Sequence, residues 1–229
     1  MQESSKTKRV RGAEFDGVYF SRTVLDIGCG DDLVVPHAQP FDMQHGDANK
    51  ILDHLPAASF DTVHSSHCLE HMHRPREALQ DWWQLVRPGG YLITVVPEED
   101  LYEQGQWPSR FNWDHKATFR LNKQTTWSPC SYDLRELHQA LPSAEIISAE
   151  IQDDGYRYEL QRLGPENPHT RNLRENQLQL IHKLNEKRLL TSFELLDELN
   201  TCFSALGATV DQTLGSALAQ IQVIARKRA

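Results

Sequence analysis

A short apolar strand that ends at two closely spaced glycines constrains the fold of this chain more than any other feature. Residues 23–27 (TVLDI) are apolar and β-branched, which is typical of a buried strand. Gly28 and Gly30 follow at once, and a turn without Cβ atoms lets the backbone approach a ligand closely. The sequence therefore predicts a ligand-binding turn at the carboxyl end of a sheet strand.

The residues around this turn limit the kind of ligand. The third glycine of the dinucleotide-binding pattern would fall on Leu33, and no lysine–serine or lysine–threonine pair follows as in a phosphate-binding loop. Asp26, Asp31 and Asp32 would serve an anionic pyrophosphate poorly. They suit a ligand with a cationic amino-acid end.

The segment after the turn has the pattern of a βαβ unit. Residues 60–66 and 91–96 read as strands, and residues 74–86 between them repeat apolar side chains at helical spacing. Residues 88–90 (PGG) end the helix and turn the chain, so we expect parallel strands joined by a right-handed crossover. Later in the chain we expect an irregular, aromatic-rich segment over 97–130, a helix over 133–141, and strands over 145–151 and 219–225.

Three motifs in this order resemble the class I S-adenosylmethionine-dependent methyltransferases, in particular the subgroup that acts on small molecules. They are LDIGCG at 25–30, SFDTVHSSHCLEH at 59–71 and VRPGGYLITVVP at 86–97. The resemblance implies an α/β, Rossmann-like, mostly parallel seven-stranded sheet with helices on both faces and a helical insertion before the last strand. It also implies S-adenosylmethionine as the cofactor and methyl transfer as the activity.

The resemblance assigns cofactor roles to residues near the glycine turn. Asp26 would lie near the methionine amino group, Gly28 and Gly30 would back the ligand, Asp42 would hold the ribose hydroxyls and Asp47 the adenine amine. The full expected cofactor set is Asp26, Gly28, Cys29, Gly30, Asp42, Asp47, Ala48 and Ser66.

The spacing of the two later acids departs from the family pattern. Only twelve positions separate Gly30 from Asp42, and five separate Asp42 from Asp47, so the usual helices there must be very short or missing. Either acid can then take the other's role, or both can be solvated loop residues.

Histidines supply the candidate catalytic groups. A hydroxyl acceptor gains from a general base, and histidine is the natural one near neutral pH. His67, His71 and His115 are the candidates, with Asp114 next to His115 in the sequence. For His67, contact with the cofactor backbone alone is an equal alternative. The expected acceptor-site residues are Trp107, Arg110, Trp113 and Asp114. The acceptor we expect is a small molecule or a saccharide intermediate, methylated on oxygen rather than nitrogen.

Three other functions are alternatives to methyl transfer to a small molecule. Residues 67–71 (HCLEH) match the inverted zinc-protease signature, but they follow a strand instead of lying on a helix, so no metal site is expected. A second alternative is a cofactor-binding partner protein without catalysis. An RNA methyltransferase is disfavoured because the formal charge is −8 and no basic, aromatic-interleaved stretch is present.

Length and composition predict one cytoplasmic domain. The 229 residues allow one substantial core, and we expect an N-terminal arm over 1–20 that is loose over 1–11, a methyltransferase domain over 21–229 and a helical insertion at about 165–206. The apolar stripe of a helix over 177–203 offers a surface for a homodimer. Four scattered cysteines favour reduced thiols, and no apolar run is long enough to span a bilayer.

Overall fold

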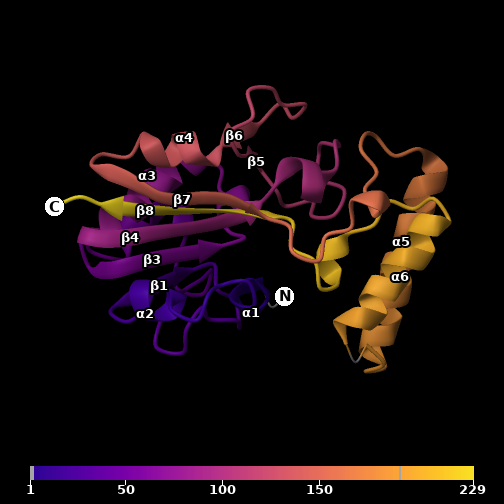
Figure 1. The fold of residues 1–229 in the computed structure, drawn as a ribbon, viewed down its shortest axis with the longest axis horizontal. Helices are drawn as coiled ribbons and strands as arrows, with labels where there is room; N and C mark the ends of the chain where they lie inside the picture. Colours follow the sequence, from indigo (N-terminus) through magenta and orange to yellow (C-terminus); the bar gives the residue numbers. More distant parts are fainter. Residues whose placement is uncertain (1–2, 191) are drawn as a thin grey trace.

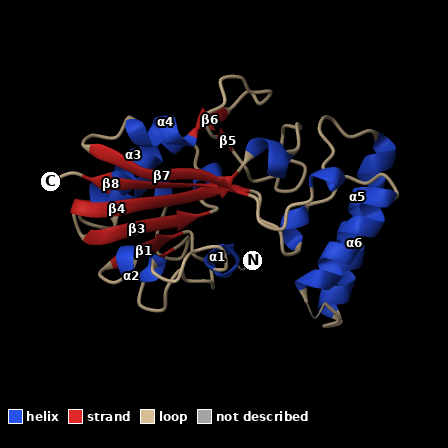
Figure 2. Cartoon of the chain, viewed as in Figure 1, coloured by secondary structure: helices blue, strands red, loops and turns tan. Residues whose placement is uncertain are grey.

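The computed structural model describes residues 3–190 and 192–229, and a single six-stranded sheet organises them (Figures 1 and 2). The strands lie in the order β2-β1-β3-β4-β8-β7. The first four are parallel, and β8 is antiparallel to both of its neighbours. Their bounds are β1 Val24–Ile27, β2 Gln39–Phe41, β3 Phe60–Ser66, β4 Val86–Pro97, β7 Ala144–Gln152 and β8 Gln220–Lys227.

The sheet has the predicted class but one strand fewer than the seven expected. The described segment between Phe41 and Phe60 holds only the 3₁₀ helix η1, Ala48–Asp53. A parallel crossover needs a dozen or more residues of its own, so this segment has no room for a helix, a further strand and the return into β3. The strand β2 is therefore the edge of the sheet.

Alternating side chains bury both faces of the sheet. Leu92 and Val223 join the larger core, under α3 (Pro75–Leu85) and α4 (Leu134–Gln139), and the next residue of each strand, Ile93 or Ile224, joins a second cluster on the other face. Phe20, directly after α2 (Phe15–Tyr19), completes that second cluster. The two faces of the sheet are thus covered by different parts of the chain.

The N-terminal segment is not the loose arm that the sequence predicts. It forms α1, Glu3–Lys8, in which Thr7 is fully buried and the Lys6 ammonium donates to the carbonyl of Thr213 at 2.6 Å. The amide nitrogen of Gln220 donates to the Thr7 hydroxyl at 3.0 Å. These contacts with the last strand and the loop before it hold the arm down, and a polar sequence gives no sign of such distant partners.

The aromatic-rich segment after β4 is folded around short elements. The π-helical turn η3 (Glu99–Glu103) follows β4, and the strands β5 (Thr118–Arg120) and β6 (Ser131–Asp133) form a separate parallel pair. Three further 3₁₀ turns complete the described elements: η2 Leu69–His71, η4 Tyr158–Leu160 and η5 Gln212–Leu214.

Two helices form a hairpin where the sequence predicts one helix over 177–203. They are α5 (Pro168–Glu186) and α6 (Phe193–Ala205), and they lie beyond the end of the sheet at which β3 and β4 finish (Figure 1). The chain leaves α5 through Arg188, whose φ of 54° is left-handed and cannot continue a helix. Gln177 and Asn200 join the two helices through a buried amide hydrogen bond of 2.7 Å. Among the described residues, no helix has the length and apolar character needed to cross a membrane.

Buried Glu98 predicts a measurable pH effect on stability. Its carboxylate accepts hydrogen bonds from the backbone N–H groups of Asp100 and Leu101, and burial raises the pKa of Glu98 from 4.5 to about 7. Between these two values the folded state keeps a proton that the unfolded state releases, so this group makes stability fall as pH rises. At about 1.4 kcal/mol per pKa unit, the loss is about 3 kcal/mol.

The variant Glu98→Gln keeps an acceptor oxygen for both N–H groups but does not titrate. Urea unfolding of both proteins at a series of pH values isolates the Glu98 contribution from that of other titrating groups. We expect the difference in unfolding free energy between variant and wild type to grow across this pH window. A difference that does not vary with pH would contradict the prediction.

Candidate active site

The turn after β1 forms a backbone cradle, and its first residue, Gly28, has room for glycine only. Gly28 has φ +74° and Gly30 has φ +52°, both left-handed. A Cβ added to Gly28 would lie 2.5 Å from the Cβ of Cys68, on the loop after β3, and the N–H of Gly28 donates to the carbonyl of Phe41 at the end of β2. Three strand ends therefore meet at this turn.

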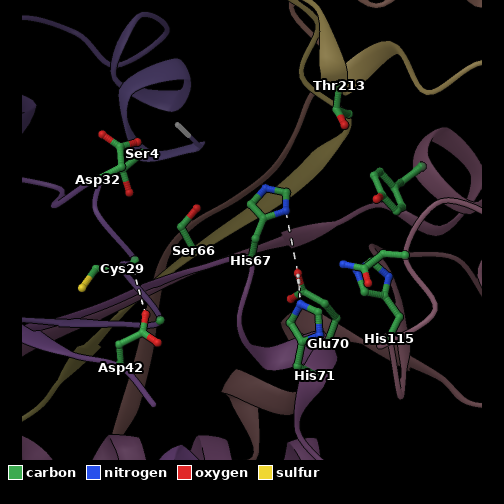
Figure 3. A pocket seen from close by; sticks show the side chains of 14 residues that line it. Ser4, Cys29, Asp32, Asp42, Ser66, His67, Glu70, His71, His115 and Thr213 are labelled. Atoms are coloured by element: carbon green, nitrogen blue, oxygen red, sulfur yellow. Dashed lines mark hydrogen bonds and ion pairs between the residues drawn. The ribbon is translucent and has the colours of Figure 1, made fainter. Parts of the chain in front are cut away.

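Two adjoining cavities open at these strand ends. Their volumes are about 220 and 370 Å³, and they share Gly28, Asp42, His67 and His71. The smaller cavity is also lined by Ser4, Cys29, Gly30, Asp32, Ser66, Glu70, Tyr102, Asn112, His115 and Thr213 (Figure 3). The larger one is also lined by Phe41, Met43, Gly46, Asp47, Ala48, Asn49, Cys68, Met72 and Asp114. A ligand bound at the glycine turn can extend into both.

Most of the expected cofactor residues line these cavities. Asp42 follows β2, and its carboxylate accepts a 2.7 Å hydrogen bond from the N–H of Gly30. Asp47 caps the start of η1, where its side chain accepts from the N–H of Asn49. Ala48 lies beside it, and Cys29 and Ser66 line the smaller cavity. The side-chain oxygen of Ser66 is buried and has no hydrogen-bond partner among the described residues.

Asp26 is the member of the expected cofactor set that lies outside both cavities. It is 1% exposed and is not among the residues that line either cavity. Its carboxylate accepts from the Nδ1–H of His64 at 2.7 Å and from the N–H of Val34 at 2.7 Å. Arg11 donates to Nε2 of His64, which fixes the neutral tautomer, and burial lowers the pKa of His64 despite the nearby carboxylate. Asp26 thus joins β1 to His64 of β3 and to Val34, a few residues after the glycine turn.

The lining of the cavities fits S-adenosylmethionine. Among the described residues, neither cavity has a lysine or arginine in its lining, so nothing there balances a phosphate. Asp32, Asp42 and Glu70 suit a ligand that carries ammonium and sulfonium charges. Ribose hydroxyls can donate to Asp42 at the end of the second strand. The Cβ-free turn, its acidic lining and the unpartnered Ser66 hydroxyl thus fit the cofactor's chemistry.

His67 lies between the two cavities on a strained turn. It follows the last residue of β3, has φ +52°, and donates from Nε2 to the Gln220 side-chain oxygen at 3.1 Å. A left-handed non-glycine residue costs energy and is often found at functional sites. With Nε2–H donated to Gln220, the ring nitrogen that can accept a proton is Nδ1, which lies 3.7 Å from Oε1 of Glu70.

Each of the other two candidate histidines donates a hydrogen bond to a carboxylate. His71 donates from Nδ1 to Asp114 at 3.1 Å, and His115 donates from Nδ1 to Glu103 at 2.6 Å. Asp114 therefore pairs with His71 and not with its sequence neighbour. Burial lowers the pKa of His115, but the hydrogen bond with Glu103 and the nearby Glu70 carboxylate outweigh it, so the pKa is raised overall. The rings of His71 and His115 are 5.0 Å apart.

The sequence does not assign a role to Glu70 and Glu103, the two acids that lie beside these histidines. Glu70 lies inside the HCLEH motif, which was the signal for it, whereas nothing in the sequence marks Glu103. Two backbone hydrogen bonds bring the parts together, because the carbonyl of Glu70 accepts from the N–H groups of Lys116 and Ala117. His67 and His71 do not share a helix face, since His67 is itself left-handed and the short turn η2 begins only at Leu69.

Three of the expected acceptor residues do not line either cavity. The guanidinium of Arg110 is buried and donates to Thr209, Gln104 and Gly164, so it holds loops together. Trp113 is 85% exposed, and Trp107 is likewise absent from both linings. Of the expected acceptor set, only Asp114 borders a cavity.

The sheet order and the glycine cradle define a Rossmann-like class I methyltransferase, with a reversed strand between β4 and β7. A family profile described as a methyltransferase domain matches residues 8–145. This span is more than half of the chain, and the chain belongs to that family, as an S-adenosylmethionine-dependent methyltransferase. No curated protein matches the chain.

Solved structures share the fold at low sequence identity. A protein from Galdieria sulphuraria, provisionally assigned as a sarcosine dimethylglycine methyltransferase, is 12% identical over 99% of this chain and 84% of its own, with a TM-score of 0.50. A methyltransferase from Archaeoglobus fulgidus described as SAM-dependent is 18% identical over 99% of this chain and 95% of its own, with a TM-score of 0.47. The likeness to the Galdieria sulphuraria protein, at 12% identity, shows the fold alone and leaves the acceptor open.

Proposed function

We propose that this enzyme transfers the methyl group of S-adenosylmethionine to a hydroxyl of an uncharged small molecule, with saccharides as the leading class. The observation that carries the proposal is the composition of the smaller cavity beside the glycine turn. It brings three imidazoles, Tyr102, Asn112 and Thr213 together and, among its described residues, has no lysine or arginine. Such a surface hydrogen-bonds hydroxyl groups and, among its described residues, lacks the permanently charged side chain that would hold a phosphate or carboxylate.

Segments from both ends of the chain border the cavity. Ser4 of α1 and Thr213 of η5 line it (Figure 3). The Ser5 backbone N–H donates to Asp32 at 2.8 Å, and the Lys6 ammonium joins α1 to η5. The cavity volume of about 220 Å³ supports a small substrate over a macromolecular one.

When bound, S-adenosylmethionine supplies a methyl group on a sulfonium, and the acceptor oxygen takes that methyl as the carbon–sulfur bond breaks and its electron pair stays on sulfur. The products are a methyl ether, a neutral thioether and one proton. The protein's main contribution to such an in-line displacement is to orient the reactants. His67 borders both cavities, so we assign the released proton to its Nδ1, where the Glu70 carboxylate stabilises the imidazolium.

The proposal is tested with labelled S-adenosylmethionine and a matched panel of acceptors. The panel pairs neutral sugars and polyols with their phosphorylated counterparts and includes small amines. We expect label in an alkali-stable methyl ether from neutral hydroxyl acceptors and at least about tenfold less from each phosphorylated partner, since one uncompensated charge costs more than 1.4 kcal/mol. Preferred transfer to the phosphorylated compounds or to the amines would contradict it.

A further inference from the structure

Glu70 is a buried carboxylate in the smaller cavity that has no hydrogen-bond partner among the described residues. It is 1% exposed, it lines the cavity, and neither of its carboxylate oxygens accepts a hydrogen bond from a residue that the structure describes. Its nearest cationic or imidazole neighbours are His67 at 3.7 Å and His71 at 3.9 Å. A carboxylate taken out of water without partners costs several kcal/mol. The site therefore calls for a positive ligand beside Glu70.

The neighbouring histidines are arranged as metal ligands are. His71 and His115 each donate Nδ1–H to a carboxylate, which leaves Nε2 as the nitrogen with a lone pair. This carboxylate–histidine arrangement fixes the tautomer and orients the ring in protein metal sites. One ligand atom from each of Glu70, His71 and His115 lies within 4.8 Å of the other two.

We propose that Glu70, His71 and His115 bind one divalent transition-metal ion of the Zn²⁺ or Fe²⁺ class. Two imidazoles and one carboxylate are a ligand set for such ions, and three protein ligands leave further coordination positions toward the cavity. Metal–ligand bonds of about 2.0–2.2 Å require the three atoms to draw together on binding. The motif HCLEH thus contributes two ligands, and the third comes from the segment after η3, contrary to the expectation of no metal site.

The role of the ion rests on the proposed function. An ion at this position would hold and polarise the acceptor hydroxyl, lowering the pKa of that hydroxyl and orienting it toward the cofactor. The alternative is that protons alone balance the cluster, which also includes His67, Glu103, Asp114 and the Lys116 ammonium, 2.8 Å from Asp114.

Metal binding can be measured without any acceptor. Chelator-stripped full-length protein is titrated with Zn²⁺ by calorimetry, and its metal content is counted by elemental analysis after dialysis. Glu70→Gln preserves volume and removes the charge. Asp114→Asn acts through His71, and Asp114 is exposed, so this variant tests the site without disturbing the core. His73→Asn is the matched control, because it removes an exposed histidine of the same segment.

We expect one Zn²⁺ per wild-type chain and per His73→Asn chain, no stoichiometric ion in Glu70→Gln, and an affinity about 10- to 100-fold weaker in Asp114→Asn. S-Adenosylhomocysteine titrations of the same proteins report separately on the cofactor site. Metal binding with no methyl transfer would leave the site standing and refute only its role in the proposed function. No stoichiometric ion in the wild type, or equal affinity in wild type, Glu70→Gln and Asp114→Asn, would overturn the metal site.

Discussion

Gly28→Ala is expected to weaken the binding of S-adenosylhomocysteine at least 100-fold. The new Cβ would lie 2.5 Å from the Cβ and 2.7 Å from the Sγ of Cys68, on a residue with φ +74°. A left-handed alanine costs about 1–2 kcal/mol, and overpacking a tight contact costs roughly 1–3 kcal/mol more. The turn can relieve this strain only by moving away from Cys68, which displaces the surface that receives the cofactor. Calorimetric titration measures the affinity.

Gly89→Ala is the matched control for this variant. Gly89 has φ +83°, but a Cβ there meets nothing within 4 Å, and the residue lies outside the two cofactor-side cavities. It should lose stability through backbone strain alone and bind S-adenosylhomocysteine as the wild type does. Equal cofactor affinity in Gly28→Ala and wild type would show that the close approach of the turn to Cys68 is not needed for binding.

His67→Asn is expected to lower kcat by about 10²- to 10⁴-fold, the range for loss of a general base. Asparagine tolerates the left-handed backbone of residue 67, where φ is +52°, better than most other non-glycine replacements do. The local fold should therefore survive, and only the imidazole is lost. Single-turnover methyl transfer with labelled cofactor measures the chemical step directly.

Cofactor affinity separates this role from a structural one. We expect His67→Asn to bind S-adenosylhomocysteine within about threefold of wild type, whereas a residue that only contacts the cofactor would lose affinity and keep kcat. His73→Asn, an exposed neighbour, should retain both. A variant with wild-type kcat and weakened cofactor binding would refute the assignment of His67 as the proton acceptor.

The sequence contained enough to predict the sheet core and its glycine turn. Strong local patterns of apolar residues mark the strands β1, β3 and β4 and the helix α3. Each of these elements buries apolar side chains against elements that are close to it in the sequence. The number of strands in the sheet was harder to predict from the sequence. The missing seventh strand follows from the short segment between Asp42 and Phe60, and the family resemblance outweighed that spacing.

The sequence did not reveal which side chains pair with one another in the site. Asp114 and His115 are adjacent, yet one pairs with His71 and the other with Glu103, since successive residues of an irregular segment point in different directions. Asp26 was assigned to the cofactor because nothing local reveals that His64 and Val34 occupy its carboxylate. The tight N-terminal arm also depends on partners about 200 residues away, such as Thr213.

A crystal structure of the protein with S-adenosylhomocysteine shows whether the glycine turn receives the cofactor. We expect the amino-acid end of the ligand along Gly28 and Gly30, its ribose hydroxyls on the Asp42 carboxylate, and its sulfur facing the cavity that holds His67 and Glu70. Density for the ligand at any other place, with the glycine turn closed by the protein's own side chains, would contradict it.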